Sequence, residues 1–421
     1  MTKRAKRLLT IVTIWLFTFI CAGVGQAETV IEFWYGETGD AYVNAMNQIV
    51  ERFNNSGRGF KVNITHKGYI GGAQLDQFLT TVVSGVGPDV AYIDGTTAME
   101  YGITHNIVIP LNEVVPPAVL SGLNLLPVPK DAWYLNGTWY GIAMRTDSRG
   151  IYINERLFEE AGLNPRAGWK DIVEFDQIAA RLTKWDASGK IQILGFAPKG
   201  NNFAGELAWL WAFGAKLYDY QRNRPTLSTE PKALAAMNWI LSYAQKYGAT
   251  ARTSDSMFRN ETLAMYLTST TQLERYPIEV PDLRWWVEPI PVPAGEKPMT
   301  FSSTRGPAIP VCAKYPKEAA EFILYLLQAD VQAFWFRETQ SIPANFDAFK
   351  QILREVRDPR TRTMIEQLPY AVTYPPFFAK VVRPAFEVEV ERMRKMEITP
   401  SQALENVERA SLETFEQAFG K

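Results

Sequence analysis

The fold of this chain is decided by the stretch VIEFWYG at residues 30–36 and the two strand-like stretches that follow it. VIEFWYG is largely apolar and ends at a glycine, which is typical of a buried strand. Residues 60–64 alternate apolar and polar side chains, and DVAYID at residues 89–94 is again mostly apolar. Between them, helical spacing places apolar side chains on one face at residues 42–53 and 75–83. This order of strands and helices predicts an α/β layer with a mostly parallel sheet.

A second unit of the same class follows within residues 146–300. Residues 151–153 have a strand pattern, and residues 172–182 and 233–247 have helical spacing. The chain has 421 residues. A single core rarely exceeds roughly 250–300 residues. We therefore expect two domains.

The first 27 residues have the order of regions found in a secretory signal peptide. An apolar, uncharged run at residues 8–24 precedes the small residues Gly25 and Ala27, and it follows the basic residues Lys3, Arg4, Lys6 and Arg7. An uncleaved anchor is the alternative, but 17 residues is at the short limit of roughly 17–25 for a spanning helix. Cys21 follows Phe19-Ile20 rather than small residues, which argues against lipidation. We expect cleavage after Ala27 and a periplasmic protein.

The composition gives little support to nucleic-acid binding or to most enzyme chemistry. The chain has 44 basic and 45 acidic residues, an even balance with no basic excess for nucleic acid. His66 and His105 are the only histidines, and Cys312 is the only cysteine after the leader. Hydrolytic triads, zinc motifs and phosphate-binding glycine loops are absent from the sequence. We expect no cofactor and no metal; only carboxylate chemistry on a sugar stays open.

Aromatic residues make up 13% of the chain, including 12 tryptophans. Aromatic faces can stack on pyranose rings, although core packing is the commoner use of a tryptophan.

Several segments in order resemble the family 1 extracellular solute-binding proteins, a group that includes the maltose- and other sugar-binding components of ABC importers. These segments are IEFW at residues 31–34, SGVGPDV at 84–90, LNGTWYGI at 135–142, YINERLFEEAGL at 152–163, and the late helix at 317–332 with SIP at 341–343. The resemblance spans nearly the whole chain after the leader. It implies a type II periplasmic-binding-protein fold, with two α/β lobes that close on a ligand. The expected lobes are residues 28–144 with about 300–335, and 145–299 with about 336–421.

The ligand-facing residues expected from the strand ends and from the resemblance come from several loops. By resemblance, Asp147 occupies the place of a sugar-binding carboxylate, with a salt bridge to Arg149 as the alternative, and Phe203 occupies the place of an aromatic platform. The full set is Glu37, Thr38, Asp40, Asp94, Gly95, Thr96, Arg145, Asp147, Asn202, Phe203, Glu206, Thr271, Ser303, Thr304, Arg305 and Tyr374.

Three functions compete at this point. A monomeric sugar-binding protein that serves a membrane permease is favoured. The same fold could instead bind glycerol phosphate or another charged solute through Arg145 and Arg305. A secreted carbohydrate-active enzyme is the third reading, and it needs two carboxylates roughly 5–9.5 Å apart.

Overall fold

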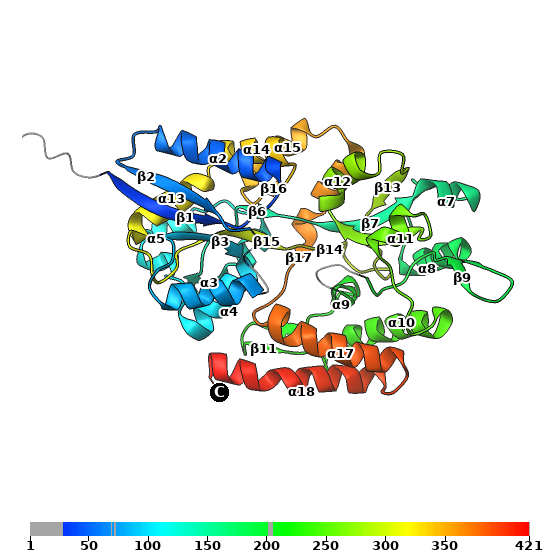
Figure 1. Cartoon of the computed structure of the whole chain (residues 1–421). Coiled ribbons are helices and arrows are strands. Elements are labelled where there is room, and N and C mark those ends of the chain that lie inside the picture. Colours follow the sequence, from blue (N-terminus) through cyan, green and yellow to red (C-terminus); the bar gives the residue numbers. More distant parts are fainter. Residues whose placement is uncertain (1–27, 69, 71–72, 201–204, 421) are drawn as a thin grey trace, which may run out of the picture.

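The computed structural model describes residues 28–68, 70, 73–200 and 205–420, and it has two lobes (Figure 1). The leader lies outside the described residues, as do Asn202 and Phe203. None of the helices in the described part combines the length and apolar character that crossing a bilayer requires.

The first lobe is built on a six-stranded sheet in the order β16-β6-β15-β3-β1-β2. Strands β1, β2 and β3 are parallel, whereas β15 runs antiparallel to β3 and β6. The strands are β1 (Thr29–Tyr35), β2 (Phe60–His66), β3 (Val90–Asp94), β6 (Arg145–Thr146), β15 (Thr304–Ala308) and β16 (Ile342–Pro343). The helices that enclose this sheet include α2 (Asp40–Asn54), α3 (Ala73–Val83), α4 (Gly95–His105), α13 (Pro316–Leu326), α14 (Ala329–Thr339) and α15 (Phe346–Glu355). The strand–helix–strand–helix–strand order predicted for residues 30–94 is confirmed.

The second lobe contains a three-stranded sheet in the order β12-β7-β13. Its strands are β7 (Arg149–Asn154), β12 (Met265–Ser269) and β13 (Trp285–Glu288). Both neighbours of β7 pair with it in the antiparallel sense, so the mostly parallel sheet expected here does not form. The reason is the direction of the strands. The chain runs away from the first lobe along β7 and returns along β12, so that Ser269 pairs with Arg149 at the cleft.

Helices cover this second sheet and complete the lobe (Figure 1). They include α7 (Glu155–Glu160), α8 (Ile172–Leu182), α9 (Leu207–Ala212), α10 (Pro231–Tyr247), α11 (Asp255–Arg259), α12 (Thr271–Glu279), α16 (Pro359–Glu366), η3 (Phe378–Val382), α17 (Arg383–Arg394) and α18 (Pro400–Phe419). The helices expected at residues 172–182 and 233–247 are present as α8 and α10.

Two segments cross directly between the sheets. The first lies at Asp147–Ser148 between β6 and β7. The second lies at Ser302–Ser303 between β14 (Thr300–Phe301) and β15. The chain does not leave the first lobe near residue 336, where we expected the boundary. Buried Ile342 lies opposite Thr146 in the first sheet, and α15 packs on α14, so the first lobe continues through α15.

Most of the tryptophans fill the cores rather than the cleft. Trp133 and Trp335 are fully buried in the first lobe, and Trp209 is fully buried in the second. Trp211 is also mostly buried, so both tryptophans of α9 serve packing. The aromatic abundance therefore reflects two large cores more than a stacking surface.

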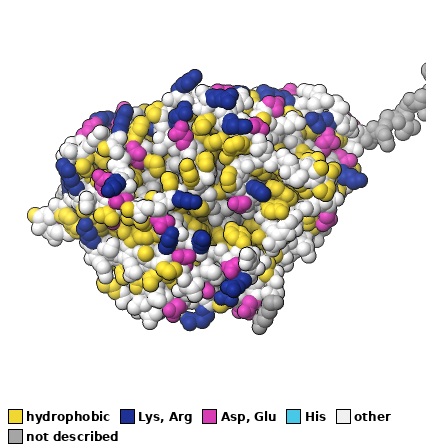
Figure 2. Space-filling view, turned by 180° about the vertical axis from the view of Figure 1, so that it is seen from behind, with side chains coloured by type: hydrophobic (Ala, Val, Ile, Leu, Met, Phe, Trp, Pro, Cys, Tyr) yellow, Lys and Arg dark blue, Asp and Glu magenta, His cyan; other side chains and the backbone are white. Residues whose placement is uncertain are grey.

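Charged side chains of both signs are interspersed over the face of the molecule that Figure 2 shows. This face has no large patch of one charge, in agreement with the even balance of the sequence.

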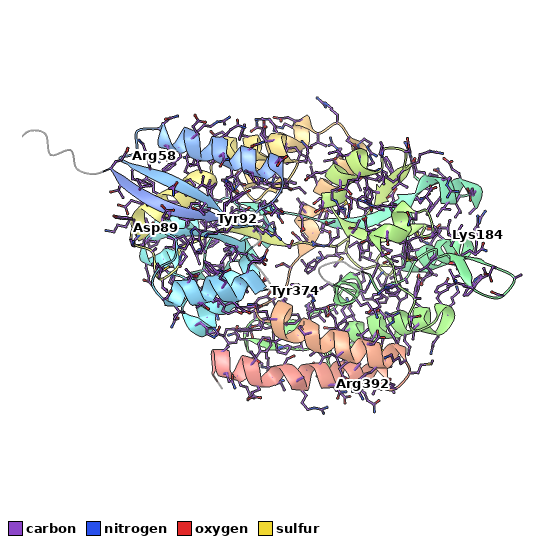
Figure 3. All side chains as sticks on the ribbon, viewed as in Figure 1. Arg58, Asp89, Tyr92, Lys184, Tyr374 and Arg392 are labelled. Carbon is purple, nitrogen blue, oxygen red and sulfur yellow. The ribbon has the colours of Figure 1, made fainter. Side chains whose placement is uncertain are left out.

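Asp89, in the turn before β3, joins three elements of the first lobe (Figure 3). Its Oδ2 accepts a hydrogen bond from the backbone N–H of Glu32 in β1 at 2.9 Å. Its Oδ1 accepts from the backbone N–H groups of Lys314 and Tyr315, at 2.7 and 3.0 Å, at the start of α13. A carboxylate with several amide donors satisfies groups that would otherwise be left without partners in the interior.

We expect Asp89→Ala to lower the free energy of unfolding by roughly 2–4 kcal/mol, because three amide donors lose a charged acceptor. Urea unfolding of the matched Asp282→Ala variant is the control, since Asp282 is exposed on a loop. Equal stability of the two variants would contradict the assignment.

Candidate functional site

A cavity of about 460 Å³ lies between the two sheets, where strands of both lobes end. This position agrees with the rule that ligands of open α/β sheets bind beyond the carboxyl ends of strands. Its lining residues are mostly polar: Asp94, Arg145, Asp147, Arg149, Asp255, Tyr266, Thr268, Ser269, Thr271, Gln272, Arg275, Ser303 and Arg305.

Glu37, in the loop after β1, lies behind the first-lobe wall of the cavity and binds two of its arginines. Its Oε1 accepts from Arg145 Nε at 2.7 Å, and its Oε2 accepts from Arg305 Nη1 at 2.8 Å. Arg305 also donates through Nε to Asp94 Oδ1 at 2.9 Å. Burial alone would raise the pKa of the Glu37 carboxyl, but the two arginines outweigh it and hold that pKa below its ordinary value.

Asp147 ties the two crossing segments together. Its Oδ1 accepts from Arg149 Nη1 at 2.7 Å and from the backbone N–H of Ser303 at 2.6 Å. Its Oδ2 accepts from Ser303 Oγ at 2.9 Å. Arg149 is itself held by the carbonyl of Phe301 at 3.0 Å. Asp147 therefore forms the salt bridge with Arg149 that was the alternative reading from the sequence, and it also lines the cavity.

The second-lobe wall presents hydroxyl and amide groups together with charges that already have partners. Arg275 donates to Glu279 at 2.8 Å, and Asp255 binds Arg259 at 2.8 Å. The neutral lining groups of this wall are Tyr266, Thr268, Ser269, Thr271 and Gln272. Gln272 is buried, and within the described part of the chain its Oε1 accepts no hydrogen bond.

The lobes also touch on two sides of the cleft. On one side, α2 meets α12 through Tyr42 and Glu274. On the other, Lys380 of η3 lies over the ring of Tyr101 in α4, 3.3 Å from its centroid. Burial raises the pKa of the neighbouring Glu100 carboxyl and lowers that of the Lys380 ammonium, because both have lost water.

The structure brings six of the sequence-predicted residues into the cavity lining and places a seventh, Glu37, directly behind it. The six are Asp94, Arg145, Asp147, Thr271, Ser303 and Arg305.

Other residues of the predicted set lie outside this lining. Thr304 is buried and accepts a hydrogen bond from Trp133 at 2.9 Å, and Gly95 packs against the same indole. Thr38 and Asp40 are exposed near the start of α2, and Thr96 is half-buried in the first turn of α4.

Two further predicted residues belong to the interior of the second lobe. Glu206 pairs with buried Arg394 at 3.4 Å. Tyr374 is buried against Trp211 and Phe301, and Figure 3 shows it where the two lobes meet.

The sequence reading missed most of the second-lobe wall. The missed lining residues are Arg149, Asp255, Tyr266, Thr268, Ser269 and Arg275. Alternation along β12 could have placed Tyr266 and Thr268 on one face. Which face meets the first lobe depends on the pairing of β12 with β7, which no local pattern reveals. In the described part of the chain, no group of three or more histidine, cysteine, aspartate or glutamate side chains is arranged to hold a metal.

Comparison with known proteins gives a family and a fold. Residues 48–353 match the model of a family described as bacterial extracellular solute-binding protein. A Brucella abortus (strain 2308) protein described as a binding protein is 26% identical over 228 residues, which is 51% of this chain and 53% of that protein. The match thus spans about half of that relative. The sn-glycerol-3-phosphate-binding periplasmic protein of Yersinia pestis is 25% identical over 93% of this chain and 94% of its own length.

Solved structures of binding proteins share the fold over nearly the whole chain. CpMnBP1 with mannobiose bound is 25% identical, with a TM-score of 0.72, and the match covers 91% of this chain and 100% of that one. The cyclic alpha-maltosyl-1,6-maltose binding protein from Arthrobacter globiformis is 19% identical, with a TM-score of 0.76, and covers 93% and 100%. The type II periplasmic-binding-protein fold expected from the sequence is confirmed.

We expect Glu37→Gln to lower the free energy of unfolding at pH 7 by about 3 kcal/mol, because two half-buried arginines lose their shared counter-charge. The carboxylate stabilises the protein above its ordinary pKa of 4.5, and this contribution is lost as the pH falls through the lowered pKa of the folded state. The difference between wild type and variant in urea unfolding should therefore shrink at pH 3. Glu416→Gln, on the exposed face of α18, is the control. A Glu37→Gln variant as stable as wild type at pH 7 would show that the ion-pair network contributes nothing.

Proposed function

The chain belongs to the bacterial extracellular solute-binding proteins, and we propose that it captures a neutral sugar between its lobes and delivers it to the permease of an ABC importer. Its place of action on this proposal is the periplasm, as a monomer exported by a cleaved leader. The observation that supports a neutral sugar as the ligand is the pairing of charges in the cleft. Each of the lining arginines has an acidic partner, as Arg145 has in Glu37. A site that is electrically balanced before the ligand arrives favours a ligand without net charge.

The polar groups that remain suit hydroxyl ligands. Thr268, Ser269, Thr271 and Gln272 supply donors and acceptors along one wall. An ion-paired carboxylate such as Asp147 can still accept a further hydrogen bond, since an ionised carboxyl has about four acceptor positions. Tyr266 is the aromatic member of the described lining, but its ring is buried in the second-lobe core.

Glycerol phosphate is the second candidate. The Yersinia relative named for that ligand supports it, and so does the N-terminus of α12, whose first residues Thr271 and Gln272 line the cavity. Helix N-termini attract anions. Against it, a phosphate site gains most from arginines whose forks are free for bidentate binding, and here Arg145 and Arg149 are committed to carboxylates.

Catalysis is not part of the proposal. A glycosidase needs one carboxyl that holds a proton and one that acts as base or nucleophile. The lining carboxylates Asp94, Asp147 and Asp255 each form an ion pair with an arginine, so none of the three is a carboxyl without a charged partner.

A thermal-shift screen of residues 28–421 should find stabilisation by neutral mono- or disaccharides and none by glycerol phosphate. A sugar at 100 times its dissociation constant should add roughly 2.7 kcal/mol to the free energy of unfolding. Mannobiose is the first sugar to test, because a structural neighbour holds it. Stabilisation by phosphates alone would contradict the sugar proposal. Release of reducing ends from a glycoside would contradict the proposal of a binding protein without catalysis.

Gln272→Ala should weaken sugar binding roughly tenfold, about the value of one hydrogen bond to a well-placed group, and leave the melting temperature of the ligand-free protein unchanged. The reason is that Gln272 belongs to the cavity lining and its buried Oε1 has no partner in the described part of the chain. Isothermal titration calorimetry measures the affinity. Asp147→Ala is the contrast, because it should lower both affinity and stability through Arg149 and Ser303. If Gln272→Ala binds the sugar as tightly as wild type, the second-lobe wall is not part of the ligand-binding site.

A further inference from the structure

One hydrogen bond joins the two lobes across the side of the cleft where α2 approaches α12 (Figure 1). The Tyr42 hydroxyl of α2 lies 3.2 Å from Glu274 Oε1 and 3.3 Å from Glu274 Oε2 in α12. The two residues are 232 positions apart and belong to different lobes. Their contact can therefore exist only while the lobes are close together.

The two ends of this contact differ in what holds them. The Tyr42 ring packs edge-on against fully buried Trp335, with the centroids 5.5 Å apart, so the first-lobe core fixes it. Glu274 lies in the short helix that carries Thr271, Gln272 and Arg275 on the cavity wall. Anchoring Glu274 to the first lobe thus also fixes the direction in which the wall of α12 faces the ligand.

We infer that the Tyr42–Glu274 hydrogen bond is an interlobe latch, in which Glu274 positions the ligand-facing residues of α12 without touching the ligand. This role rests on the proposed function, because the latch matters for capture only if a ligand is held between the lobes. A ligand gains from closure only through interactions that differ between the open and closed states. The latch is an interaction present only in the closed state, so it favours closure without contacting the ligand.

The charges around Glu274 make the latch sensitive to pH. Burial raises the pKa of its carboxyl to about 7; the Tyr42 hydrogen bond and Arg145 act in the opposite direction, and the Glu37 carboxylate adds to the increase. Tyr152 of β7 is the further titratable group that interacts with it. When the lobes separate, water returns to the carboxyl and its pKa falls toward the ordinary 4.5.

The sign of the pH effect follows from this difference. The closed form binds a proton more tightly than the open form, so protonation favours closure. The added stability of the closed form is complete below about pH 4.5 and is lost as the pH rises through about 7. Affinity for a captured sugar should follow the same course.

The test uses the mature chain and four variants: Tyr42→Phe, Glu274→Gln, Glu274→Ala and the double variant Tyr42→Phe/Glu274→Ala. Small-angle scattering without ligand measures closure through the radius of gyration, and calorimetry with mannobiose at pH 6 and pH 8 measures affinity. Ile278→Ala is the matched control on α12, because Ile278 is 81% exposed.

We expect Tyr42→Phe and Glu274→Ala each to enlarge the radius of gyration and to weaken mannobiose binding roughly tenfold at pH 6. The double variant should be no weaker than either single variant, because both remove the same interaction. Glu274→Gln keeps an acceptor for Tyr42 and should restore closure while it abolishes the pH dependence.

The latch is overturned if Tyr42→Phe and Glu274→Ala leave the radius of gyration unchanged, or if their effects on it add independently. It is likewise overturned if Glu274→Gln keeps the wild-type pH profile. If mannobiose and the other sugars fail to bind wild type, the proposed sugar fails, while the scattering experiment still decides the latch.

Discussion

The cleft of this protein depends on one buried carboxylate, Glu37, which holds a guanidinium from each of the strands that lead to the crossing segments. Arg145 on β6 and Arg305 on β15 both reach it, at 2.7 and 2.8 Å. Removing three charges from water is costly, and only close opposite charges offset that cost. The arrangement therefore fixes the two strands and the loop after β1 to a single geometry. The crossing segments start from that fixed point, and Asp147 then ties them to each other through Arg149 and Ser303.

This constraint also decides what kind of solute the cleft suits. Once Glu37 and Asp94 have engaged the arginines, the first-lobe wall offers paired charges of both signs rather than unbalanced charge. The opposite wall offers hydroxyls and an amide. Polyhydroxylated neutral molecules match such a surface, since each hydroxyl both donates and accepts. Every tryptophan of the described residues lies outside the cavity lining.

Two short crossing segments and two lateral contacts join the lobes. The crossings at Asp147–Ser148 and Ser302–Ser303 are short, and Asp147 of the first accepts hydrogen bonds from Ser303 of the second, so they are a cross-bonded connection rather than a loose linker. Tyr42 with Glu274, and Tyr101 with Lys380, join the lobes away from that connection. Each contact includes a side chain whose charged form is disfavoured by burial, Glu274 in the first and Lys380 in the second.

The sequence by itself determined the class of the protein. Apolar runs such as residues 30–35 and the spacing of residues 42–53 are local signals, and they correctly predicted β1 and α2. Ordered motifs such as SGVGPDV at residues 84–90 indicated the family, and the role of Asp89 in joining β1 to α13 explains that motif physically. Residues at strand ends, such as Asp94 and Arg145, could be placed at the cleft because strand ends of one sheet meet at one edge.

Only the tertiary structure decided the rest, because the remaining features depend on pairings between distant segments. The antiparallel register of β12 on β7 sets which side of β12 faces the first lobe, and so it brings Thr268 and Gln272 to the cavity. The pairing of β16 with β6 keeps residues beyond 336 in the first lobe. Glu206 looked equally suited to a ligand in the sequence, yet its charge is used by Arg394. A carboxylate has the same local pattern whether its partner is a ligand or an arginine 188 residues away, and only the folded chain distinguishes the two.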